Sequence, residues 1–142
     1  PQLRQLFAKL LRGEQPLAYN CSAGQDRTGF TTAMVMSALG VSRADIFTDY
    51  HLSTQLRRPA NELPPIDAAT AAKNPVAGFF ARYQQAGAFA KAQPLYSPDG
   101  TPLLSYALGA IEKDYGSVEA YLKVELGVGP AEITRLRALY TE

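Results

Sequence analysis

Apolar residues recur along much of this chain at helical spacing. Between residues 2 and 12 they stand three or four positions apart, which predicts a helix with one apolar and one basic face. Gly13 follows, where a helix commonly ends on a left-handed residue. Capping residues and apolar runs of the same kind predict further helices over residues 30–39, 42–54, 76–92, 103–115, 117–127 and from 130 onward.

One short segment has a different pattern. Residues 16–20 (PLAYN) form an apolar run after a turn signal, which predicts a buried strand. A single strand cannot satisfy its own backbone groups and needs neighbouring strands. With about six helices beside it, the strand indicates an α/β fold of which this chain is the C-terminal, mostly helical part. We therefore expect residues 1–142 to be one domain truncated at its N-terminus, with the rest of the sheet in the missing segment.

The segment between this strand and the next helix carries the candidate chemistry. Residues 21–29 read CSAGQDRTG. A cysteine facing a helix N-terminus meets partial positive charge, which lowers its pKa and favours the nucleophilic thiolate. The backbone N–H groups of the following residues can surround a tetrahedral anion such as phosphate or sulfate. Gly24 relieves the steric limits of so tight a curve.

Three side chains after the loop glycine complete the candidate site. Arg27 can bind two phosphate oxygens with its planar guanidinium, and it stays charged at every working pH. Thr28 can place a hydroxyl near the sulfur and stabilise it as a leaving group. Asp26 is the only acid in the loop, so it is a candidate general acid; a structural role in binding loop amides is an equal alternative. The sequence thus predicts attack of Cys21 on phosphorus and a cysteinyl-phosphate intermediate.

Composition and charge narrow the other classes of function that the chain could have. The 142 residues are 46% hydrophobic and 19% charged, as in a globular protein, with a net charge of +1. This balance offers no electrostatic basis for binding nucleic acid, and it makes a DNA-binding helix pair around Gly127 improbable. One cysteine excludes an intrachain disulfide, and no apolar run is long enough for stable insertion in a membrane. We expect no metal and no cofactor, because no metal-ligand spacing is present.

The loop resembles that of the Cys-x5-Arg phosphatase superfamily. It is most similar to the bacterial tyrosine phosphatases whose loop reads His-Cys-x-Ala-Gly-Lys-Asp-Arg-Thr-Gly, and residues 49–53 and 111–122 extend the resemblance. The resemblance implies a protein-tyrosine or dual-specificity phosphatase acting on phosphotyrosine-containing proteins or peptides, in the cytoplasm or secreted. It assigns the nucleophile to Cys21 and phosphate binding to Ser22, Ala23, Gly24, Gln25, Asp26 and Arg27.

Two departures from that loop leave alternatives open. Asn20 replaces the family's histidine, which predicts a weaker thiolate and keeps a non-catalytic phosphotyrosine-binding protein in consideration. Gln25 replaces the lysine of the more lipid-active members, which argues against a phosphoinositide phosphatase. Arg57 and Arg58 could supply the lost cation, although solvated surface charges are the simpler interpretation.

Two groups of residues outside the loop have structural interpretations. His51 is the only histidine, and a lone histidine is most often packed or hydrogen-bonded. The aromatic residues of the 76–92 segment are most simply core. In the similar family, helices after the loop can form a lid, and bending at Gly78 and Gly87 would permit one here. The aromatic residues in question are Phe79, Phe80, Tyr83 and Phe89.

Overall fold

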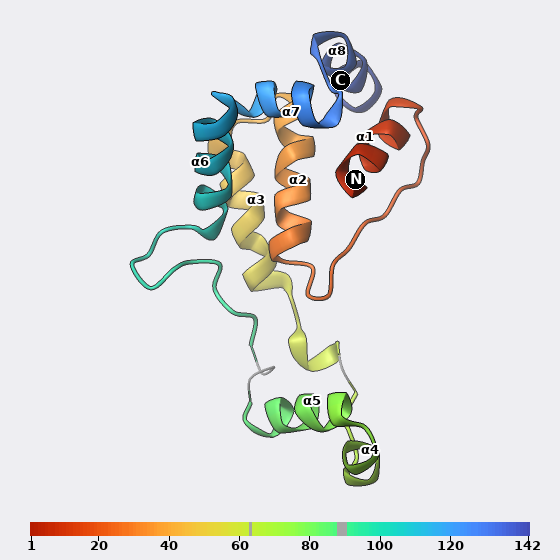
Figure 1. Ribbon diagram of the computed structural model, residues 1–142, viewed down its shortest axis with the longest axis vertical. Coiled ribbons are helices and arrows are strands. Elements are labelled where there is room, and N and C mark those ends of the chain that lie inside the picture. Colours follow the sequence, from red (N-terminus) through yellow and green to blue (C-terminus); the bar gives the residue numbers. More distant parts are fainter. Residues whose placement is uncertain (63, 88–90) are drawn as a thin grey trace. The chain divides into compact units, whose positions relative to one another are not determined.

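The computed structural model describes residues 1–62, 64–87 and 91–142 (Figure 1). Two compact units emerge from the contacts within the chain. The first combines Pro1–Leu52 with Leu95–Glu142, and the second is Ser53–Pro94. The loop at Cys21 lies in the first unit, so the first unit positions the candidate site.

The first unit is a helical assembly around one central helix. Its elements are α1 (Gln2–Leu11), α2 (Asp26–Leu39), most of α3 (Arg43–Leu56), α6 (Leu103–Tyr115), α7 (Val118–Leu126) and α8 (Pro130–Tyr140). Helix α2 contacts α6, α7 and α8, while α1 packs on α7 and α8. None of the helices in the described part of the chain is long and apolar enough to cross a membrane.

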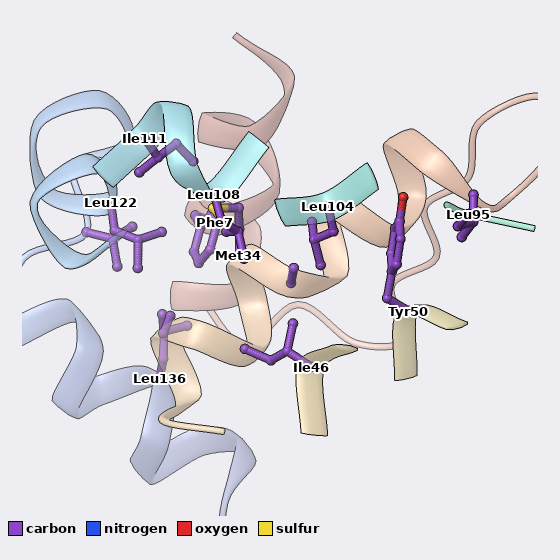
Figure 2. Close-up of a cluster of buried hydrophobic side chains, with 13 residues drawn as sticks. Phe7, Met34, Ile46, Tyr50, Leu95, Leu104, Leu108, Ile111, Leu122 and Leu136 are labelled. Carbon is purple, nitrogen blue, oxygen red and sulfur yellow. The ribbon is translucent and has the colours of Figure 1, made fainter. Parts of the chain in front are cut away.

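The core of this unit forms along α2. Met34, at the middle of α2, is completely buried, as is Leu122 of α7. Figure 2 shows the buried side chains in one cluster, from Leu122 and Leu136 at one end to Tyr50 and Leu95 at the other. Because Ala33, Met34 and Ala38 of α2 are buried in this cluster, the helix has a fixed place relative to the surrounding helices.

Both ends of α2 have local devices that define them. Gly40 ends the helix in the left-handed conformation, at a φ of +86°. The guanidinium of Arg137 lies beside it and donates from Nε to the Ala38 carbonyl at 3.2 Å, which suits the negative end of the helix dipole. The start differs from the sequence prediction: α2 begins at Asp26, four residues before Phe30, because the polar second half of the motif forms its first turn.

The remaining helix ends follow their sequence signals closely. Ser117 caps α7 by accepting from the Ala120 N–H at 3.0 Å, and Gly127 ends it at a φ of +71°. The predicted 103–115 helix is observed with those bounds. Ser42 Oγ accepts from the Asp45 N–H at the start of α3, as the capping pattern predicts.

The second unit is a small helical hairpin. It contains a 3-10 turn (Pro59–Asn61), α4 (Ala68–Lys73) and α5 (Pro75–Gln85). Asn74 caps α5 by accepting from the Val76 N–H at 2.9 Å, and α4 was not predicted. The predicted 76–92 helix is too long, since α5 ends at Gln85.

The role expected for the glycines and aromatic residues of this unit needs correction. A Cβ at Gly78 would lie 2.8 Å from the Ala71 carbonyl oxygen, so this glycine permits close packing of α4 on α5 rather than bending. Phe79 and Tyr83 are 47% and 46% exposed, so the prediction that they are core residues is wrong. Their rings contact each other on one face of α5, at 4.6 Å between centroids. Phe89 lies outside the described residues.

The predicted strand is not observed. Residues 16–20 have no regular secondary structure, and Leu17 is their only residue that is not exposed. A strand is defined by hydrogen bonds to a neighbouring strand, and the described residues contain only an isolated bridge between Tyr96 and Pro102. The described part of the chain is thus mostly helical, with eight α-helices, of which only α4 has no counterpart among the predicted segments.

Core packing predicts a large difference between two residues on α7. Replacing the fully buried Leu122 with alanine should lower the free energy of unfolding by about 2–5 kcal/mol, because it leaves a cavity against α2. Val124→Ala on the same helix is the control, since Val124 is 63% exposed, and it should change stability by less than about 1 kcal/mol. Urea unfolding followed by circular dichroism measures both, and equal losses would contradict this core.

Candidate active site

The candidate site is the turn that connects residue 21 to α2. The Cys21 N–H donates to Thr28 Oγ1 at 2.9 Å, which closes the chain onto the first turn of the helix. The Thr28 oxygen accepts this hydrogen bond, so the proton of its hydroxyl group is free to be donated to the cysteine sulfur.

The surroundings of Cys21 favour its thiolate. A hydrogen bond from the Thr28 side chain is the largest influence, opposed by partial burial and reinforced by backbone N–H groups of Thr28, Ala23 and Gly24. Together they lower the pKa of Cys21 from 9.0 to about 6. Roughly nine-tenths of the thiol is therefore ionised at pH 7.

The loop between Cys21 and α2 has the curvature predicted from its glycine. Gly24 has a φ of +67°, a backbone conformation that other residues adopt only at a cost. The amides of Ala23 and Gly24 contribute to the lowered pKa of Cys21, as expected of N–H groups that face the inside of the turn. Gln25, the N-cap of α2, is only 5% exposed, so its side chain is turned into the protein rather than toward a ligand in solvent.

Arg27 lies in the first turn of α2, and its side chain reaches back to the start of the loop. Its Nη2 donates to Ser22 Oγ at 3.0 Å, which links the start of the loop to its end. Arg27, Cys21 and Thr28 all line a hollow of about 440 Å³. The opposite wall includes Leu3 and Leu6 from α1, which the sequence analysis had not connected with the site.

Asn20, which replaces the family's histidine, contacts the backbone. Its Nδ2 donates to the Cys21 carbonyl at 3.2 Å. The lowered pKa of Cys21 arises from Thr28 and the loop amides, not from this side chain. The loop itself therefore favours ionisation of the thiol, without a contribution from residue 20.

Asp26 is the first residue of α2, and it faces a second hollow of about 330 Å³. Arg27 and Tyr50 line the same space. Burial, and secondarily the charge of Asp26, raise the pKa of Tyr50 to about 12. Tyr50 belongs to residues 49–53, which extend the family resemblance, but no role was predicted for it; its four-residue spacing from Ile46 places both on the buried face of α3.

The residues outside the loop have structural contacts. His51 stacks on Tyr96 with 4.2 Å between ring centroids, which agrees with a packed histidine. Arg57 forms a two-point ion pair with Glu62, each contact at 2.7 Å, and only 17% of its side chain is exposed. The description of Arg57 as a solvated charge is therefore wrong. Arg58 donates to backbone carbonyls, including that of Arg57 at 3.1 Å.

The arrangement can perform one kind of chemistry particularly well. A thiolate, inward-facing amides and an arginine lie at the positive end of one helix, where a tetrahedral dianion is stabilised. An acid stands at the same helix end, at Asp26. Among the described residues no group of three His, Cys, Asp or Glu side chains could hold a metal ion.

Comparison with known proteins agrees with this site. The model of a tyrosine phosphatase family matches residues 1–142. The triple specificity protein phosphatase PtpB of Mycobacterium tuberculosis is 31% identical over 146 residues, which cover 92% of this chain and 45% of that protein. A tyrosine-protein phosphatase of Nostoc commune is 27% identical over 146 residues, which cover 96% of this chain and 43% of that protein. The chain thus spans less than half the length of these relatives, and it belongs to the tyrosine phosphatase family.

Proposed function

We propose that this chain is the nucleophile-bearing part of a phosphatase that hydrolyses phosphotyrosine in proteins. The observation that supports this most directly is the place of Cys21 at the N-terminus of α2, where its N–H donates to Thr28 Oγ1 at 2.9 Å and where Thr28 and the loop amides lower its pKa. The family membership supports the same reaction class. A lone buried cysteine would have none of this polar environment.

The proposed reaction has two steps. The Cys21 thiolate attacks phosphorus, the bond to the tyrosyl oxygen breaks, and that oxygen takes a proton from a general acid. Water then attacks the cysteinyl-phosphate and gives a proton to the carboxylate that the general acid has become; the S–P bond breaks, and inorganic phosphate leaves with the thiolate restored. Loop amides and Arg27 stabilise the equatorial oxygens in both steps, and the Thr28 hydroxyl stabilises the departing sulfur. Asp26 is the candidate acid of the described chain, at the start of the same helix.

Gln25 bears on the choice of substrate. A phosphoinositide carries several phosphates, and a second phosphate is best bound by a further cation beside the loop. Gln25 is neutral and 5% exposed, so it offers no such contact. This favours phosphotyrosine over phosphoinositides, even though the name of the Mycobacterium relative describes three specificities for that protein.

The first test is phosphate release from a phosphotyrosine peptide and from a phosphoinositide in the presence of a chelator. The protein should hydrolyse the peptide faster than the lipid, and Cys21→Ser should abolish release from both while leaving peptide binding measurable. Faster turnover of the lipid would contradict the argument from Gln25. Peptide binding without turnover by the unaltered protein would support a non-catalytic phosphotyrosine-binding protein.

Removal of the Thr28 hydroxyl should make Cys21 less acidic. Because this is the only cysteine, the pH dependence of its alkylation by iodoacetamide reports its ionisation directly. The midpoint should lie near pH 6 and rise toward 9.0 in Thr28→Val, by about one unit or more. Since the thiolate is the nucleophile, turnover should fall as the pH drops through this midpoint.

A matched control exists on α3. Thr48 Oγ1 donates to the Ala44 carbonyl at 3.0 Å, far from the loop in sequence, so Thr48→Val should leave the alkylation midpoint near 6. A midpoint that is unchanged in Thr28→Val would show that the threonine hydroxyl does not stabilise the thiolate.

Catalytic activity should be sensitive even to a substitution of Arg27 that keeps the positive charge. Arg27→Lys loses the planar pair of donors, so kcat/KM for the peptide should fall by about 100-fold or more. Arg12→Lys is the control, since Arg12 pairs with Glu14 on the exposed surface and should lose almost nothing. Steady-state kinetics with equal loss in both variants would argue against phosphate binding by Arg27.

A further inference from the structure

The first turn of α2 rests on the ring of Tyr50. A Cβ added to Gly29 would lie 2.6 Å from Tyr50 Cδ2 and 2.7 Å from Cε2, closer than a carbon atom can approach. The edge of the ring therefore lies directly against the Gly29 backbone. Because Gly29 has no side chain, the ring of Tyr50 has room to lie against the helix at this position of the motif.

Tyr50 is itself firmly held. Its side chain is 3% exposed and belongs to the core cluster, one helical turn after the buried Ile46 (Figure 2). The ring of His51 packs against it at 5.4 Å between centroids, and His51 in turn stacks on Tyr96. A side chain with two torsion angles in such an environment has little freedom to move.

The position of this turn determines the chemistry of the loop. Thr28 directly precedes Gly29, and its hydroxyl has the largest influence in lowering the pKa of Cys21. The Thr28 oxygen also anchors the Cys21 N–H at 2.9 Å. A shift of the turn by one ångström would break or lengthen both hydrogen bonds, whose strength falls steeply with distance.

We propose that Tyr50 is a positioning residue for the loop, whose ring holds the first turn of α2 at the place where Thr28 bonds Cys21. This inference deepens the proposed function and rests on it for its relevance to catalysis. The phenol end of the ring also lies within the electrostatic reach of Asp26. The buried side chain of Tyr50 thus supports the turn that carries both Thr28, the partner of Cys21, and Asp26, the candidate acid.

Alkylation of the only cysteine tests the inference without any need for turnover. In Tyr50→Ala the midpoint of the alkylation rate against pH should rise above 6 by about one unit or more, because the turn is no longer supported. Tyr50→Phe keeps the ring and should retain the midpoint near 6. Leu136→Ala is the matched core control, since Leu136 is 1% exposed on α8; it should lower stability without moving the midpoint.

A second variant covers the case in which Tyr50→Ala fails to fold. Gly29→Ala adds one methyl group against the ring, at a helical position where alanine is otherwise favoured by about 1 kcal/mol. It should raise the midpoint while the far-ultraviolet circular dichroism stays unchanged. A folded Gly29→Ala protein with its midpoint still near 6 would overturn the inference, as would a Leu136→Ala protein with the same rise as Tyr50→Ala.

The two proposals fail in different ways. A midpoint that moves as expected in a protein without phosphatase activity would support Tyr50 as a positioning residue and contradict the proposed function. An active phosphatase whose midpoint and kcat are insensitive to Tyr50→Ala and Gly29→Ala would keep the proposed function and exclude the positioning role.

Discussion

The hydrogen bond between the Cys21 amide and the Thr28 hydroxyl is the constraint on which the site depends. It joins an irregular segment to a helix that is anchored in the core by Ala33, Met34 and Ala38, so the loop takes its position from α2. The same hydroxyl, with its acceptor side occupied, turns its proton to the sulfur and lowers the pKa of the thiol. The packing of α2 therefore fixes the position of the hydroxyl that favours the Cys21 thiolate.

Local groups can allow a nearly neutral protein to bind a highly charged ligand. The net charge of +1 gives no long-range attraction for phosphate, so binding must come from local groups. In the proposed function, loop amides, a helix terminus and Arg27 together supply these groups at one point. Arg137 supplies a cation at the opposite end of α2, where the dipole is negative, so both ends of the central helix are matched in charge.

Sequence patterns predicted the features that depend on local chemistry. Caps and terminal glycines such as Ser117 and Gly127 mark helix ends because they satisfy backbone groups within a few residues. The strand predicted at 16–20 is not observed, since the described residues contain no neighbouring strand to which it could hydrogen-bond. The loop chemistry was readable from the spacing of Cys21 and Arg27, whereas the contact of Tyr50 with Gly29 joins two helices and has no local signature.

The central claim is that Cys21 becomes phosphorylated during turnover. The direct measurement is the intact mass of the protein after a phosphotyrosine peptide is mixed with it and the reaction is quenched with acid within milliseconds. The account predicts an added phosphoryl group that maps to Cys21, appears before free phosphate and is absent in Cys21→Ser. Release of phosphate with no phosphorylated protein at any time, or with the phosphoryl group on another residue, would contradict it.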